Sequence, residues 1–141
     1  MTTENPTTKK AGTEVDLVRQ LKESLEERGY VVSEEVPSHG RARTDLVLWD
    51  GEILIGVEAK LSDWGRVIGQ AALNRQCVDQ SYLAMWSSAI SDVILAEAAR
   101  FGIGVMSLGD GGAFVLLQPT HGGPIPELRQ KLIGALESGL R

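Results

Sequence analysis

Residues 45–70 read DLVLWDGEILIGVEAKLSDWGRVIGQ, and this stretch decides the fold. It holds two segments typical of strands, residues 46–49 and 53–60, the second beginning with the apolar run ILIGV, and the tight-turn signal Asp50-Gly51 lies between them. Two such segments around a tight turn predict a β-hairpin. Apolar residues then recur in steps of three and four, which predicts a helix over residues 64–78. The stretch is therefore expected to be a hairpin that leads into a helix.

The sequence on either side supplies the rest of an α/β domain. The polar segment 1–12 is predicted to be a loose tail, and Thr13-Glu14-Val15-Asp16 has the form of a helix-capping box. The other predicted elements are helices over 13–28, 91–100 and from 126 onward, and strands over 30–36, 82–86, 104–108 and 113–118. This order predicts one domain over residues 13–141, with a mixed sheet flanked by helices on both faces and a C-terminal β-hairpin and helix.

Composition excludes several classes of protein. The chain has 141 residues, a formal net charge of −5 and a single cysteine, Cys77, so it has no internal disulfide and no zinc site built from paired cysteines. No apolar run approaches the roughly 20 residues that span a bilayer, and the first residues lack the apolar segment of a secretory signal. We therefore predict a cytoplasmic protein without membrane contact. Because proteins that coat DNA are usually basic, any contact with nucleic acid must come from a local patch or a bound metal.

Three ionisable residues of the hairpin form the candidate site. Asp45 opens one strand and Glu58 and Lys60 stand near the end of its partner, so the turn is expected to bring Asp45 beside Glu58. Glu58 and Lys60 are two positions apart, which predicts that both side chains leave the strand on the same face. Close carboxylates repel each other unless a cation lies between them, and Mg²⁺ prefers oxygen ligands, to which the carbonyl of Ala59 could add. The other interpretation is an ordinary surface pair, with Asp45 as an ordinary turn residue.

Asp45 followed by Glu58-Ala59-Lys60 resembles the PD-(D/E)XK phosphodiesterase signature of the restriction-endonuclease-like superfamily, and the element order over residues 13–108 resembles its αβββαβ core. The resemblance implies a nuclease that depends on Mg²⁺ or Mn²⁺, with Asp45 and Glu58 as metal ligands and Lys60 as the catalytic lysine. Gln70, on the following helix, is similar to the glutamine that some branches carry there. Thr44 stands where the name of the motif has proline, a position that varies widely in the family.

Further candidates flank this motif. Continuing the apolar stripe of the first helix (Val18, Leu21 and Leu25, with Leu17 beside it) backwards by four residues reaches Glu14, which is then expected to face the sheet. Some branches of the family supply a further metal-associated glutamate from this helix, although the helix dipole also favours an acid in the first turn. The candidate contacts to a nucleic-acid backbone are Arg41, Arg43, Arg66 and Asn74, and solvent exposure explains these polar residues equally well.

The candidate residues predict a nuclease that hydrolyses phosphodiester bonds, and the family resemblance favours DNA over RNA as the substrate. The chain has little room for a separate sequence-reading module, so it would cut by structure, cut with little specificity, or be targeted by a protein partner. The leucine-rich last helix could form a homodimer surface or pack against the sheet. The alternative function is a non-catalytic nucleic-acid-binding or regulatory module on the same scaffold, which the acidic charge of the chain favours.

Overall fold

Helices and strands follow one another in the order expected from the sequence. The computed structural model describes residues 13–37 and 43–138, so the predicted tail over residues 1–12 lies outside the described residues. The elements are α1 (Glu14–Glu27), β1 (Val31–Pro37), β2 (Arg43–Trp49), β3 (Leu54–Ala59), α2 (Trp64–Asn74), β4 (Gln80–Trp86), a short 3₁₀ helix (Ser87–Ala89), α3 (Asp92–Arg100), β5 (Gly104–Gly109), β6 (Gly112–Leu117) and α4 (Pro126–Glu137).

The predicted hairpin is formed by β2 and β3, and its turn is held by the side chain of Asp50. Oδ1 of Asp50 accepts hydrogen bonds from the backbone N–H groups of Glu52 and Ile53, at 2.8 and 2.7 Å. Gly51 has a φ of +95°, a backbone conformation that disfavours any side chain. The Asp-Gly pair therefore fixes the turn and, through it, the register of the two strands.

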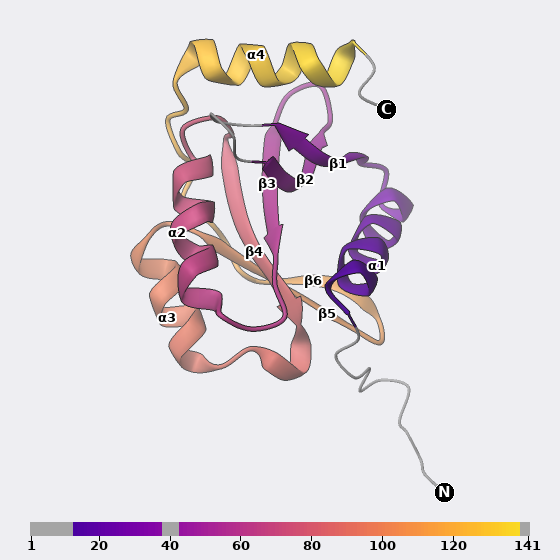
Figure 1. The fold of residues 1–141 in the computed structure, drawn as a ribbon, viewed down its shortest axis with the longest axis vertical. Helices are drawn as coiled ribbons and strands as arrows, with labels where there is room; N and C mark the ends of the chain where they lie inside the picture. The colour runs from indigo at the N-terminus through magenta and orange to yellow at the C-terminus, as the bar shows by residue number, and fades with distance from the viewer. Residues whose placement is uncertain (1–12, 38–42, 139–141) are drawn as a thin grey trace, which may run out of the picture.

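The strands form one mixed sheet in the order β1-β2-β3-β4-β5-β6. β1, β2 and β3 are antiparallel neighbours, β3, β4 and β5 are parallel, and β6 returns antiparallel to β5. α1 covers one face of the sheet, and α2 and α3 cover the other (Figure 1). The prediction of an α/β fold with a mixed sheet between helices is therefore confirmed. Among the described residues, no helix has the length and apolar character needed to cross a membrane.

α1 begins at the predicted capping box. Oγ1 of Thr13 accepts the N–H of Asp16 at 3.0 Å, and Oδ2 of Asp16 accepts the N–H of Thr13 at 3.2 Å. The residues that α1 buries are Leu17, Leu21 and Leu25. The predicted stripe is therefore rotated by one position, because Leu17 is fully buried whereas Val18 is only partly buried.

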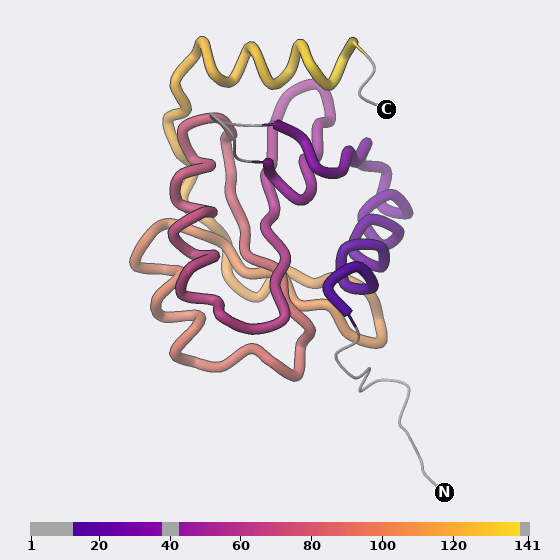
Figure 2. Tube along the Cα trace, viewed as in Figure 1, coloured from indigo at the N-terminus to yellow at the C-terminus, as the bar shows by residue number. Residues whose placement is uncertain are grey.

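α1 also contacts both edge strands of the sheet, β1 and β6. Figure 2 shows the indigo helix beside the orange hairpin of β5 and β6, far along the sequence. Oγ of Ser24 accepts the backbone N–H of Ala113 at 2.9 Å, and the guanidinium of Arg28 donates to the carbonyl oxygen of Ala113. The first helix is therefore fixed to the last strand as well as to β1.

α2 is shorter than the prediction, because it ends at Asn74 rather than at Val78. Beyond Asn74, the backbone N–H groups of Arg75, Gln76 and Cys77 bond to carbonyl groups three residues earlier, at 3.2, 3.1 and 2.8 Å. Bonds of this spacing tighten the chain into a turn that no longer follows the α-helix. Cys77 is buried in this turn, as expected from the sequence.

α4 lies across one end of the sheet (Figure 1). Its Leu132 and Ile133 are buried against Val36, Val47 and Leu54. Of the two alternatives for the leucine-rich helix, the structure therefore has packing against the sheet of the same chain.

Candidate functional site

Asp45 lies where the ladder between β1 and β2 is interrupted. The register is the same on both sides of the interruption, but Glu35 and Asp45 are not paired with each other. Glu35 has a φ of +51°, a left-handed conformation that is uncommon for a residue with a side chain. The alternation of side chains along β1 changes at this residue: Val32 packs in the core beneath α1, whereas Val36, four residues later, packs beneath α4. Backbone irregularities of this kind redirect side chains and are frequent at functional sites.

The side chain of Asp45 reaches the end of β3. Its Oδ2 accepts a hydrogen bond from the backbone N–H of Ala59 at 2.8 Å. The backbone pairing of β2 with β3 ends at Leu46 and Val57, so the next position places Asp45 beside Glu58. The structure therefore brings the two carboxyl groups together, as the hairpin turn predicts.

Glu58 is buried, with only 6% of its surface exposed. Its Oε2 accepts a hydrogen bond of 2.7 Å from Nδ2 of Asn74 in α2. Burial raises the pKa of Glu58 to about 8; the Asn74 amide opposes this change and the charge of Asp45 adds to it. Burial also raises the pKa of Asp45, where the Ala59 N–H opposes the change and the charge of Glu14 adds to it. Both carboxyl groups therefore retain a proton more readily than they would in water, unless a cation offsets their charge.

Lys60 follows the last residue of β3 and contacts a different helix from Glu58. Its Nζ lies 3.6 Å from Oε1 of Glu14, the first residue of α1. Within the described residues, no ion pair joins Lys60 to Asp45 or Glu58. Glu58 contacts α2 and Lys60 contacts α1, so the two side chains have different partners, and the prediction that they leave the strand on one face stays a prediction.

An acidic pocket of about 350 Å³ lies between α1 and the first two strands. The charged side chains that line it are Glu14, Glu34, Glu35, Asp45 and Arg19. Glu14 lines this pocket together with Asp45, and it pairs with Lys60. Carboxylates outnumber cations on its walls, so the pocket attracts cations and repels a free phosphate group.

The residues predicted to contact a nucleic-acid backbone are placed in different surroundings. Arg43 is exposed next to the site, where its Nη1 donates to the carbonyl oxygen of Glu35 at 2.9 Å. Arg66 is exposed in the first turn of α2, and Arg41 lies outside the described residues. The prediction for Asn74 is wrong, because this side chain is 1% exposed and donates to Glu58 instead of facing solvent.

Asn74, one turn beyond Gln70, is the side chain that α2 provides to Glu58. Gln70 is partly exposed and forms no hydrogen bond with another described residue, so its role in the site stays a prediction. The sequence contains the signal that identifies Asn74. Three positions after Ala71, it falls on the apolar stripe of the helix, where an amide requires a buried partner.

The donor atoms of the site suit a hard divalent cation. The two carboxyl groups also interact with each other, so oxygen atoms from both lie at the same place at the end of β3. No cluster of three or more His, Cys, Asp or Glu side chains within the described residues is arranged to hold a metal ion. Mg²⁺ commonly uses only one or two protein carboxylates and completes its shell with water and substrate phosphate. Asp45 and Glu58 therefore fit Mg²⁺ or Mn²⁺, and the Ala59 carbonyl stays a predicted further ligand.

Comparison with known proteins informs the fold. A scan against protein-family models finds no match, and a search of curated proteins finds none either. Among solved structures, the chain is similar to the SPO1766 protein of unknown function from Silicibacter pomeroyi, with a TM-score of 0.69 and 17% sequence identity. The likeness covers 90% of this chain and 86% of that chain. At this identity the likeness shows a shared fold: an α/β protein with a six-stranded mixed sheet flanked by helices and a C-terminal helix.

Proposed function

We propose that the chain is a restriction-endonuclease-like nuclease that hydrolyses phosphodiester bonds in DNA with the help of Mg²⁺ or Mn²⁺. The observation that carries this proposal is the pair formed by the buried Glu58 and the half-buried Asp45 at the end of β3, both with raised pKa values. Two carboxyl groups in such surroundings are stabilised by a divalent cation between them. Lys60 follows directly, as in the PD-(D/E)XK signature.

The fold supports the same assignment. The order α1-β1-β2-β3-α2-β4 corresponds to the αβββαβ core that the resemblance implies, and the carboxylates lie at the carboxyl end of β3. In open α/β sheets, ligands commonly bind outside the carboxyl ends of the parallel strands. The position of the site is therefore one that a substrate can reach.

Each residue has a separate role in the proposed reaction. Asp45 and Glu58 would hold the cation, and the Ala59 N–H and the Asn74 amide orient the two carboxylates. The cation, when bound, supplies Lewis-acid chemistry for the attacking water and the leaving oxygen. The Lys60 ammonium pairs with Glu14 when no substrate is bound. On substrate binding, Lys60 would leave Glu14 and offset negative charge on the phosphate.

Cleavage assays with purified full-length chain test the proposal. Supercoiled plasmid, linear duplex DNA and single-stranded RNA are incubated with Mg²⁺, with Mn²⁺, and with EDTA. We expect metal-dependent cleavage of DNA, and a loss of about 100-fold or more in Asp45→Asn, Glu58→Gln and Lys60→Ala. The matched controls are Glu127→Gln and Lys131→Ala, exposed charges of α4, which should cleave at the wild-type rate. Cleavage in EDTA, or unchanged cleavage by Lys60→Ala, would contradict the mechanism.

A second candidate function is a non-catalytic nucleic-acid-binding or regulatory module on the same scaffold. It is favoured by the pairing of Lys60 with Glu14, which engages the ammonium group that the reaction would need. This function predicts a shifted band on a native gel with DNA, in the presence of metal, without any cleaved product. A homodimer or a targeting protein partner is compatible with either function.

A further inference from the structure

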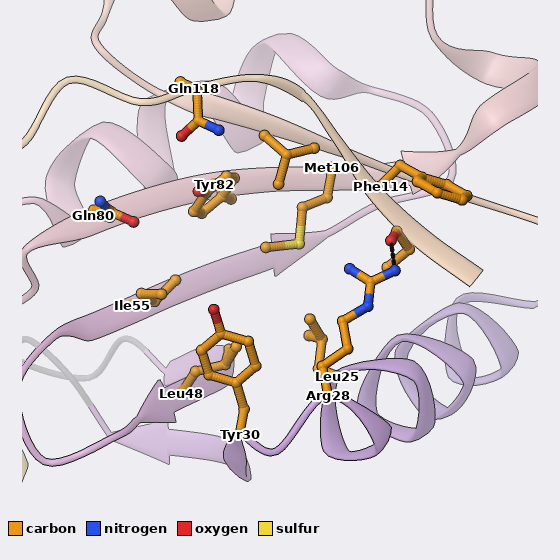
Figure 3. A pocket seen from close by; sticks show the side chains of 12 residues that line it. Leu25, Arg28, Tyr30, Leu48, Ile55, Gln80, Tyr82, Met106, Phe114 and Gln118 are labelled. Atoms are coloured by element: carbon orange, nitrogen blue, oxygen red, sulfur yellow. Dashed lines mark hydrogen bonds between the residues drawn. The ribbon is translucent and has the colours of Figure 1, made fainter. Parts of the chain in front are cut away.

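A second pocket, of about 280 Å³, lies toward the other end of the sheet from the two carboxylates. Its floor consists of side chains that β3, β4 and β5 present toward α1 (Figure 3). Ile55 and Gln80, which are register partners at the start of the parallel strands, both line it. Glu58 lies at the end of β3, so the two sites are separate. The exposed lining residues belong to the end of α1, to β6 and to the residue that follows it, so the pocket opens between these segments.

Aromatic side chains form the walls of this pocket. Tyr30 and Tyr82 lie on its two sides in Figure 3, with Phe114 at its exposed rim. The Tyr82 ring is only 4% exposed and packs against Gly104, where a Cβ atom would lie 2.7 Å from the ring. Because only glycine leaves room for the ring, the sequence of β5 fixes this wall before any ligand binds. Flat apolar walls of this kind favour a planar ligand.

Four polar groups in the pocket have no hydrogen-bond partner among the residues that the structure describes. The hydroxyl groups of Tyr30 and Tyr82 and the amides of Gln80 and Gln118 form no hydrogen bonds with other described residues. Burial, with the nearby Tyr30, raises the pKa of Tyr82, so its hydroxyl is a hydrogen-bond donor at neutral pH. Each glutamine amide offers both a donor and an acceptor. These groups can therefore bind the edge of a ring that carries donors and acceptors of its own.

Arg28 is the one charged side chain among the described residues that line this pocket. Its guanidinium lies 5.8 Å from the centroid of the Phe114 ring and donates to the carbonyl oxygen of Ala113. These contacts hold the side chain at the rim and leave further N–H groups unused, since a guanidinium has five. In a chain with a net charge of −5, the rim therefore has a local positive charge that suits an anionic group.

We propose that this pocket binds a nucleoside monophosphate. The base lies between Tyr30 and Tyr82, its polar edge contacts Gln80 and Gln118, and its phosphate contacts Arg28. The volume of about 280 Å³ is at the lower limit of ligand pockets, so it accommodates one base and leaves the sugar and phosphate at the open rim. The proposal does not depend on the nuclease function, because none of the pocket's residues belongs to the carboxylate site.

Titrations followed by ¹H–¹⁵N NMR spectra of the full chain test this proposal. The probes are 5′-AMP, 5′-UMP, adenosine and benzoate, all in EDTA so that no metal ion links them to the carboxylate site. We expect saturable shifts around Tyr82 and Gln80 with a nucleotide, and about tenfold weaker binding of adenosine than of 5′-AMP, because adenosine has no phosphate for Arg28. Benzoate should bind more weakly than either nucleotide, because it has no polar edge for the glutamine amides.

Two variants separate a binding role from a structural one. Arg28→Gln should reduce the affinity for 5′-AMP to that for adenosine and leave the affinity for adenosine unchanged. The control is Arg100→Gln, at an exposed arginine of α3, which should change the affinity for neither ligand. Tyr82→Phe keeps the ring and should weaken both ligands several-fold, with thermal unfolding as the check on folding. Absence of saturable binding, shifts confined to Asp45 and Glu58, equal affinity for benzoate, or unchanged 5′-AMP binding in Arg28→Gln would each overturn the proposal.

Discussion

The parallel strands β3 and β4 have buried carboxylates at both ends, and the two ends differ in how the charge is balanced. At the start of the strands, Asp79 accepts two hydrogen bonds of 2.9 Å from Arg129 and one of 2.8 Å from the N–H of Leu54. Burial acts to raise the pKa of Asp79, but these bonds outweigh it and the pKa lies below its ordinary value. At the other end, Asp45 and Glu58 have no cationic partner within the described residues, and both pKa values are raised.

This contrast separates a carboxylate that is balanced by an arginine from two carboxyl groups that are not. The Arg129 side chain also donates to the carbonyl oxygen of Glu52 at 3.0 Å and lies 5.7 Å from the ring centroid of Trp49, so it fixes α4 to the β2–β3 hairpin. The Asp79 carboxylate is therefore paired within the protein. The other end lacks positive charge, and a buried site that lacks a counter-charge is a candidate for ligand binding and catalysis.

Glu58→Gln should produce the largest change in stability, measured in EDTA. The pKa of Glu58 is about 8 in the folded chain against 4.5 for an unperturbed glutamate, so the folded state binds more protons between these pH values. Wild-type stability should therefore fall as the pH rises from about 4.5 to about 8. The variant should be more stable than the wild type by roughly 3 to 5 kcal/mol at about pH 9, and nearly equal to it at about pH 4.5.

Urea unfolding at several pH values, followed by tryptophan fluorescence, measures this difference. Glu127→Gln removes an exposed carboxylate from α4 and should leave the pH dependence of the wild type unchanged. A Glu58→Gln variant that is less stable than the wild type at high pH would show that Glu58 is charged and well paired, and the contrast between the two ends would be lost.

Arg129→Ala should destabilise the chain by about 2 to 3 kcal/mol at neutral pH. The change leaves Asp79 buried and charged with only the Leu54 N–H as a partner, and breaking a buried pair costs about 3 to 5 kcal/mol. We expect a loss below this range because the Arg129 side chain is 27% exposed. Since the lowered pKa of Asp79 contributes stability above about pH 4 that is lost on acidification, the variant should also lose part of this acid sensitivity.

The same denaturation series at neutral and acid pH compares Arg129→Ala with Arg100→Ala, which breaks an exposed pair on α3. The control should change stability by less than about 0.5 kcal/mol. Equal losses of stability in the two variants would mean that the ion pair of Asp79 with Arg129 does not stabilise this end of the sheet.

Asn74→Ala should have the smallest effect, a loss of about 1 to 2 kcal/mol in unfolding experiments near pH 7. It removes the buried amide that donates to Oε2 of Glu58, and an unmade buried hydrogen bond costs about this much. Gln70→Ala, one turn earlier on α2 and partly exposed, should cost less than about 0.5 kcal/mol. If Gln70→Ala were the more damaging change, Gln70 and not Asn74 would be the partner that orients the site.

The sequence predicts the elements well because their signals are local. The Asp50-Gly51 turn, the capping box of Thr13 and the apolar periodicity of the helices each depend on neighbouring residues. The proximity of Asp45 and Glu58 follows from the same turn, since a hairpin places the start of one strand beside the end of the next. These features therefore needed no knowledge of the tertiary structure.

The features that the sequence did not predict depend on where a segment ends or on what packs beside it. The ion pair of Lys60 with Glu14 joins the end of β3 to α1, and the spacing of the motif does not predict this partner. The ion pair of Asp79 with Arg129 joins segments far apart in sequence, and no spacing rule connects them. Asn74 was assigned to the exposed stripe by its polarity, whereas its helical position places it in the core.

The bonds of Ser24 and Arg28 to Ala113 also bear on how the chain reaches this fold. During synthesis α1 is made long before β6, so the helix emerges from the ribosome without part of the surface that it covers. Contacts between residues so distant in sequence slow folding, because a long loop must close before they form. We therefore expect α1 to dock onto the sheet late in folding. A chain that stops before Gly112 should still form the β2–β3 hairpin, but its α1 should pack less stably against the sheet.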